Sequence, residues 1–140
     1  NELENEVIKN QLEKTVFFVG FKDNISEILK NLDIFLFTTH REGLSVAVIE
    51  ALSSGLPIVA TNVGGINEQV FDRVNGFVLD KGDVKGMMEK CIKLIDDKHL
   101  RLRMGEKSRI VAEEKFSENR MLNEHIACYR EIFEKSKKIK

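Results

Sequence analysis

Apolar residues along the chain follow two different periods. In four places they form short unbroken runs, which predict strands buried on both faces. These runs cover 15–20, 33–39, 56–61 and 75–80. Between the runs, apolar residues recur every three or four positions, as they do on one face of a helix. The helices predicted in this way cover 24–32, 45–55 and 66–72, with further helices from 83 to the end of the chain.

Residues at the boundaries of these elements support the division. Ser26 and Ser45 stand where a helix N-cap is expected, and Ser117 opens the last helix in the same way. Gly55 stands where a helix should end, and Pro57 is tolerated because it lies at the start of a strand.

Two apolar stripes mark the helices of the C-terminal part. The first stripe comprises Val84, Met87, Met88, Cys91, Leu94 and Ile95. The second stripe, on one face of the last helix, comprises Leu122, Ile126, Tyr129 and Phe133. At this helical spacing we interpret Phe116 and Leu122 as residues of the core.

Strands that alternate with helices predict a Rossmann-like α/β fold, in which a parallel sheet carries helices on both faces. A chain of 140 residues suits one compact domain, so we expect 1–140 to form a single unit. Sheets of this kind bind ligands at the carboxyl ends of their strands. The candidate binding loops are therefore those that follow Gly20, Thr38, Thr61 and Leu79.

Composition narrows the function further. The 22 basic and 23 acidic residues leave a net charge of -1, which gives no electrostatic basis for binding nucleic acid. No apolar run approaches the ~18 residues of a membrane span, and the polar opening stretch does not resemble a signal peptide, so we expect a cytoplasmic protein. Cys91 and Cys128 lack a CxxC partner and are interpreted as free buried thiols. His99 and His125 are interpreted as helix residues without a metal.

Two glutamates interrupt the otherwise apolar segment 40–65. Glu42 lies in the loop after the second predicted strand, and Glu50 lies about one and a half turns into the following helix. A carboxylate among apolar neighbours, as at Glu50, is costly unless it is paired or faces a cleft. Carboxylates accept hydrogen bonds from vicinal hydroxyls, which a ribose or a hexose presents. The alternative is an ordinary loop residue and a solvated helix face.

The start of the same helix offers a site for an anion. The backbone N–H groups of Gly43, Leu44 and Ser45 are expected to be unpaired and to point outward, and phosphate is a common anion at such a position. Gly43 lets a ligand approach the backbone closely, because it has no side chain. The region would thus offer donors to a diphosphate and acceptors to the sugars on either side of it.

The segment "EGLSVAVIEALSSGLPIVATNVGGINEQV" resembles the signature of the retaining, GT-B-fold glycosyltransferases of family 4, the glycosyl transferases group 1. The matched positions are Glu42, Glu50, Ala51, Gly55, Pro57, Gly64, Gly65 and Glu68. "VFFVGF", "NGFVLDKGD" and "KFSENRMLNEHIACYREIF" resemble further parts of the family pattern, so the likeness extends over 16–133. It implies the C-terminal, donor-binding half of a GT-B fold.

The resemblance implies a site for a nucleotide-diphosphate sugar. Its residues would be Phe21, Lys22, Asp23, Glu42, Gly43, Leu44, Ser45, Val46 and Glu50. Glu42, the catalytic candidate, would bind the donor hexose, and Glu50 would bind the ribose. The N–H groups of the helix start would hold the diphosphate, and the turn at 21–23 would contact the base. Family members usually work without a metal, so no cofactor is expected.

The chain departs from the family pattern in two respects. Ser45 stands where many members carry glycine, which affects the details of donor binding. A "G-R-…-K-G" segment that neutralises the diphosphate and an N-terminal acceptor domain are both missing. We therefore expect the chain to be most of the donor-binding domain of an enzyme at least about twice as long, and to be unable to transfer sugar alone.

By family base rate the donor would be a UDP-hexose or UDP-N-acetylhexosamine. The acceptor would be a glycan or lipid-linked molecule in surface polysaccharide or lipopolysaccharide synthesis, such as O-antigen. The alternatives are the nucleotide-binding module of a GT-B epimerase or phosphorylase, and a non-catalytic nucleotide-sugar binder. The lysine-rich tail at 135–140 is a candidate for peripheral contact with an anionic membrane, and the alternative is a solvated chain end.

Overall fold

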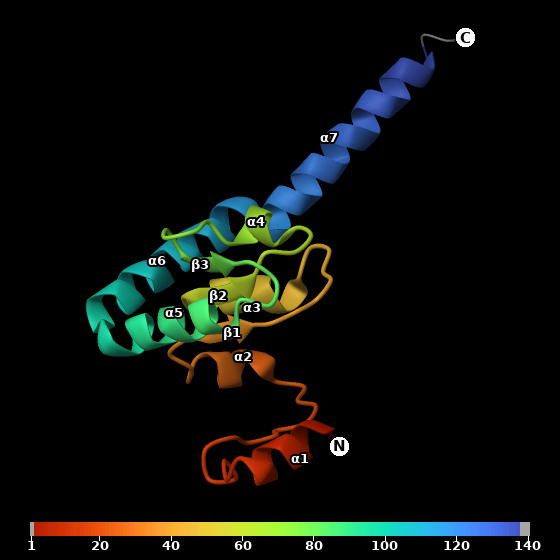
Figure 1. Ribbon diagram of the computed structural model, residues 1–140. Coiled ribbons are helices and arrows are strands. Elements are labelled where there is room, and N and C mark those ends of the chain that lie inside the picture. Colours follow the sequence, from red (N-terminus) through yellow and green to blue (C-terminus); the bar gives the residue numbers. More distant parts are fainter. Residues whose placement is uncertain (1, 138–140) are drawn as a thin grey trace.

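The computed structural model describes residues 2–137, which form an α/β structure around a parallel sheet (Figure 1). The sheet contains three strands in the order β1-β2-β3. Their bounds are Phe35–Phe37 for β1, Ile58–Thr61 for β2 and Gly76–Leu79 for β3. Leu36 is in register with Val59, and Val59 with Phe77. Three of the four predicted strands are therefore confirmed, each shorter than its apolar run.

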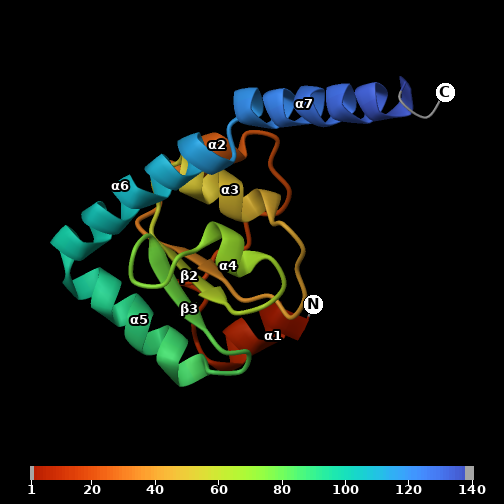
Figure 2. The ribbon, with the colours of Figure 1, turned by 90° about the horizontal axis from the view of Figure 1, so that it is seen from above.

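Helices cover both faces of the sheet, as the alternating pattern predicts (Figure 2). The helices of the described residues are α1 (Glu2–Lys9), α2 (Ile25–Leu29), α3 (Val46–Ser53), α4 (Ile66–Gln69), α5 (Val84–Asp96), α6 (Lys98–Lys115) and α7 (Glu118–Lys137). Residues of α2 to α6 pack into the two cores, whereas α1 and α7 lie apart from the sheet. On one face, Ile58 and Ala60 pack into a core with Leu52 of α3. On the other face, Val59 packs with Phe77 of β3 and Leu94 of α5. Successive side chains of β2 thus enter opposite cores, because side chains alternate along a strand.

Local sequence explains where the helices begin and end. Asp83 caps α5 by accepting a hydrogen bond from the Gly86 N–H at 2.8 Å, and Asp97 caps α6 in the same way. Helix α3 ends at Ser53, and Gly55, two residues further on, has a φ of 73°, which places it in the left-handed region. There the N–H of Leu56 bonds to the carbonyl of Ala51, which completes a Schellman motif. The prediction that Gly55 ends this helix is confirmed.

The first predicted strand, at 15–20, is wrong. This segment has no strand partner, and Phe17 remains 73% exposed. A run of strand-forming residues becomes a strand only where a sheet edge is within reach, and β1 pairs only with β2. Instead, Val16 and Phe18 line a hollow with Leu3 and Val7 on the N-terminal side. Helix α1 and this segment therefore lie apart from the sheet (Figure 1).

The two C-terminal stripes are buried only in part. In the first stripe, Met87 and Leu94 are buried, whereas Val84, Met88 and Ile95 are exposed. In α7 no residue is buried, so the interpretation of Leu122 as core is wrong, although Phe116 does pack against the core. An amphipathic pattern shows that a helix has an apolar face but does not supply the surface that covers it.

The two cysteines differ in their surroundings. Cys91 lies on α5 and packs against the core, and this burial raises the pKa of its thiol. Cys128 is exposed on α7, so the expectation that both thiols are buried is wrong for Cys128. Of the lysine-rich tail, for which membrane contact and a solvated chain end were the two alternatives, residues 138–140 lie outside the described part of the chain. Among residues 2–137 no helix has the length and apolar composition needed to cross a membrane.

Candidate functional site

The carboxyl edge of the sheet brings two loops into direct contact. The loop after β1 carries Glu42 and Gly43, and the loop after β2 carries Gly64 and Gly65. The Gly65 N–H donates to the Gly43 carbonyl at 3.2 Å. A side chain at Gly64 would overlap the carbonyl oxygen of Glu42, and Gly64 has a φ of 52°. The paired glycines are therefore required by the close approach of the Glu42 loop, and they hold that loop in place.

Helix α3 begins at this edge, with Ser45 as its N-cap. The Ser45 side chain makes no capping hydrogen bond. Its backbone N–H donates to Gln69 Oε1 at 3.1 Å, and the Gln69 side-chain amide donates to the Ser45 carbonyl at 2.8 Å. The Gly43 N–H donates to Glu42 Oε1 at 3.2 Å. The expectation that the N–H groups of Gly43 and Ser45 are unpaired is therefore wrong.

Other N–H groups at the start of α3 are open to a ligand. Within residues 2–137, the N–H groups of Leu44 and Val46 make no hydrogen bond. The side chains of these two residues are also exposed. Two donors at the positive end of a helix dipole remain at the carboxyl edge, where an anion can reach them.

Glu50 lies further along α3, on the side that faces α2. Its side chain is partly buried and lines a cavity of about 290 Å³ together with Ile25 and Ser26 of α2. Among the described residues, the Glu50 carboxylate has no ion pair and no hydrogen-bond donor. Lys30 and Arg109 line the same cavity; the Arg109 guanidinium pairs with Glu113 at 2.6 Å and donates to the Ser53 carbonyl. Glu50 is thus a partly buried carboxylate with free acceptor capacity.

The remaining predicted site residues lie elsewhere around α2. Lys22 and Asp23 line a separate hollow of about 680 Å³ with Glu27 and Ile28, on the opposite side of α2 from Glu50. Phe21 is 90% exposed. The structure therefore brings Glu42 to the Gly64 loop and Glu50 to α2, and it does not place the turn at 21–23 in one cavity with either glutamate.

A network of buried polar side chains behind the site was not predicted from the sequence. Gln69 and Asn75 are both fully buried, and Asn75 donates to the Gln69 carbonyl at 3.0 Å. Ser108 of α6 donates in turn to the Asn75 carbonyl at 3.2 Å. This buried polar network connects the start of α3 to α6 across the end of α4. A signal was present, since a glutamine and an asparagine interrupt apolar residues there, but neither suggests its partner 24 or more residues away.

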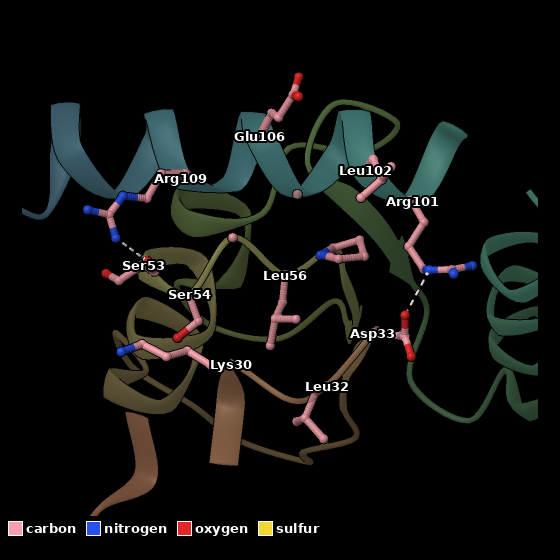
Figure 3. A pocket seen from close by; sticks show the side chains of 13 residues that line it. Lys30, Leu32, Asp33, Ser53, Ser54, Leu56, Arg101, Leu102, Glu106 and Arg109 are labelled. Atoms are coloured by element: carbon pink, nitrogen blue, oxygen red, sulfur yellow. Dashed lines mark hydrogen bonds and ion pairs between the residues drawn. The ribbon is translucent and has the colours of Figure 1, made fainter. Parts of the chain in front are cut away.

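A further cavity, of about 500 Å³, lies at the opposite, amino edge of the sheet (Figure 3). Its two arginines are engaged, with Arg101 3.3 Å from Asp33 and Arg109 bonded to the Ser53 carbonyl, whereas Lys30 and Glu106 also line the cavity. Arg101 also donates to the carbonyls at the end of α5. These arginines therefore hold helix ends together and are not free to bind a ligand.

A family model for "Glycosyl transferases group 1" matches residues 1–111. The chain belongs to this family. Two curated bacterial relatives agree. The chain is 38% identical over 106 residues to a capsular polysaccharide biosynthesis glycosyltransferase, CapM, of Staphylococcus aureus, covering 76% of this chain and 28% of the relative. It is 29% identical over 133 residues to the N-acetyl-alpha-D-glucosaminyl L-malate synthase of Bacillus anthracis. This match covers 94% of this chain and 35% of the relative.

Solved glycosyltransferases share the fold. The crystal structure of HepE from Anabaena in complex with UDP matches with a TM-score of 0.85 and 27% identity, covering 93% of this chain and 36% of HepE. The architecture is that of the C-terminal half of a GT-B fold. The chain spans about a third of the length of the curated relatives that it matches. The resemblance in the Glu42–Glu68 segment is therefore confirmed at the level of the family.

Proposed function

We propose that this chain is the donor-binding domain of a retaining glycosyltransferase of family 4, which binds a nucleotide-diphosphate sugar at the carboxyl edge of its sheet. One observation supports this most directly. Glu50 is a partly buried carboxylate without a partner, on the helix whose open N-terminus lies at that edge. Such a carboxylate is free to accept hydrogen bonds from the hydroxyl groups of a ligand.

Each part of the site would bind a different part of the donor. The N–H groups of Leu44 and Val46 would bind the diphosphate, and the dipole of α3 would stabilise the negative charge that develops as the diphosphate leaves. Glu50 would accept hydrogen bonds from the ribose hydroxyls. Glu42, held against the Gly64 loop, would accept them from the hexose and is the catalytic candidate. The turn formed by Phe21, Lys22 and Asp23 remains a proposal for the base, and it would have to approach α3 when the nucleotide binds.

The donor and the acceptor rest on the relatives. HepE was crystallised with UDP, and a relative 32% identical over 91 residues is a UDP-Gal-dependent galactosyltransferase of Escherichia coli that acts on a diphosphoundecaprenol substrate. We therefore propose a UDP-hexose or UDP-N-acetylhexosamine donor, without a metal, and a glycan or lipid-linked acceptor in surface polysaccharide synthesis. The acceptor would bind to an N-terminal domain outside this chain, so this chain alone would not transfer sugar.

Calorimetric titration with UDP and UDP-glucose tests the site. We expect binding, and we expect Glu50→Gln to weaken it about tenfold or more, because hydrogen bonds to a charged group contribute ~1.5–3 kcal/mol. The matched control is Glu68→Gln, which changes an exposed glutamate on α4. Binding should persist in EDTA if no metal is involved.

Three results would contradict the proposal. Absence of binding at millimolar nucleotide would contradict the proposed donor site. An equal effect of both glutamine variants on binding would contradict the role proposed for Glu50. Steady sugar transfer by the 140-residue chain alone would contradict the assignment of the acceptor to a separate domain. Binding without transfer, in a longer chain that carries an acceptor domain, would favour the non-catalytic binder.

A further inference from the structure

Helix α4 holds the start of α3 through one buried side chain (Figure 2). Gln69 is completely buried and makes two hydrogen bonds with a single residue. Its Oε1 accepts from the Ser45 N–H at 3.1 Å, and its Nε2 donates to the Ser45 carbonyl at 2.8 Å. A residue in an antiparallel sheet exchanges the same two bonds with its partner, and Ser45 has the extended backbone of a strand, with φ -83° and ψ 117°. The amide fits in one orientation only, because one end must accept and the other must donate.

The bond to the Ser45 carbonyl also fixes the direction of the next N–H group. The peptide unit between Ser45 and Val46 is planar and trans, so its carbonyl and its N–H point in opposite directions. Since the carbonyl points to the Gln69 amide, the Val46 N–H points away from α4. The Ile49 N–H donates to the same carbonyl at 3.1 Å, as the first bond of the helix. The direction of the Val46 N–H is therefore set by Gln69 and by the helix together.

The Leu44 N–H is held in the same way. The Gly65 N–H donates to the Gly43 carbonyl at 3.2 Å, and this carbonyl shares a peptide plane with the Leu44 N–H. The Leu44 N–H therefore also points away from the segment 65–69. This segment thus binds the carbonyl end of each of the two peptide units whose N–H groups are open. Two donors that point away from the same support suit an anion with several oxygens.

We propose that Gln69 is a positioning residue for the donor, which directs the Val46 N–H toward the diphosphate by holding the Ser45 carbonyl. The inference rests on the proposed function, since it requires the diphosphate to bind at the start of α3. It adds that a side chain 24 residues away determines which N–H groups are free there and where they point. Gln69 is buried and does not touch the donor, so its replacement should weaken the binding of the phosphates more than that of the nucleoside.

An NMR titration of this chain with UDP and with uridine tests the proposal. In the unaltered chain, UDP should shift the Val46 amide proton and should bind more tightly than uridine. Gln69→Glu keeps an acceptor for the Ser45 N–H but places a carboxylate oxygen against the Ser45 carbonyl. We expect the ratio of the dissociation constants of uridine and UDP to fall at least about threefold, because a hydrogen bond that fixes the Val46 N–H is lost. Gln69→Met should lower the ratio as well, without burying a charge, and it serves if the first variant fails to fold.

The matched control is Ser108→Ala, which removes a buried hydrogen bond to the Asn75 carbonyl at the far end of the buried polar network. It should lower stability but leave the ratio unchanged, because the Asn75 carbonyl still accepts from the Ile58 N–H at 3.2 Å. An unchanged ratio in both Gln69 variants, an unshifted Val46 amide in the unaltered chain with UDP bound, or an equal fall in Ser108→Ala would overturn this inference alone. Absence of UDP binding by the unaltered chain would contradict the proposed function, and this inference with it.

Discussion

The central unit at 25–116 and the two segments that flank it, 2–20 and α7, are similarly rich in apolar residues, yet these residues are buried to very different extents. In the central unit, Leu52, Ile58 and Leu94 are completely buried. In the flanking segments, Phe17 at the N-terminal side and Tyr129 in α7 are 73% and 67% exposed. The difference lies in neighbours, because each face of the central sheet has a helix layer to pack against and the flanking segments have none. Apolar side chains therefore stabilise the fold only where the tertiary structure provides a second surface against which they pack.

The largest contrast should come from truncating the central core. Leu52→Ala removes a fully buried side chain from the contact between α3 and the sheet. We expect a loss of ~2–5 kcal/mol in the free energy of unfolding, from lost burial and from the cavity that remains. Urea denaturation followed by circular dichroism measures this. A loss near zero would show that the central unit is no better packed than the flanking segments.

The next effect should come from the contact between the two loops at the carboxyl edge. Gly64→Ala places a side chain against the Glu42 carbonyl at a residue with positive φ. We expect a destabilisation of ~2–3 kcal/mol and weaker UDP binding, because the Glu42 loop must move. Gly82→Ala is the control, since Gly82 also has positive φ but has open space around it. Equal effects of the two substitutions on UDP binding would argue against a special role for the loop contact.

A smaller effect on stability is expected from a substitution in the buried polar network. Gln69→Met keeps the volume of the side chain but removes both hydrogen bonds to Ser45. Leaving these buried backbone groups unpaired should cost ~1–3 kcal/mol and should increase hydrogen exchange at the start of α3. Hydrogen-exchange mass spectrometry of 42–50 detects the change. Unchanged exchange there would show that Gln69 does not hold the helix start in place.

The smallest effect should come from the N-terminal flanking segment. Phe17→Ala truncates a side chain that is 73% exposed, so we expect the free energy of unfolding to change by no more than about 0.5 kcal/mol. The same denaturation experiment as for Leu52→Ala measures it, which makes the two variants a direct pair. A loss comparable to that of Leu52→Ala would show that the Phe17 side chain is buried in solution.

Much of the central unit could be predicted from the sequence. The strands, the helix stop at Gly55 and the position of Glu42 and Glu50 around α3 all follow from patterns within a few residues. The role of Gly64 did not, because it depends on the Glu42 carbonyl 22 residues away. The pairing of the Ser45 N–H with Gln69 was missed for the same reason. For the candidate site, local pattern identified the residues, whereas the partners of their backbone groups depended on long-range contacts.

By itself, the sequence determined the order of the elements in the central unit, the end of α3 before Gly55 and the family, since periodicity, a stop signal and a motif are written in neighbouring positions. Only the tertiary structure decided which apolar surfaces are covered. It left 15–20 without a strand partner and α7 without a cover, and it paired the two loops at the carboxyl edge. The physical reason is that burial and strand pairing are properties of two surfaces, and a local pattern describes only one of them.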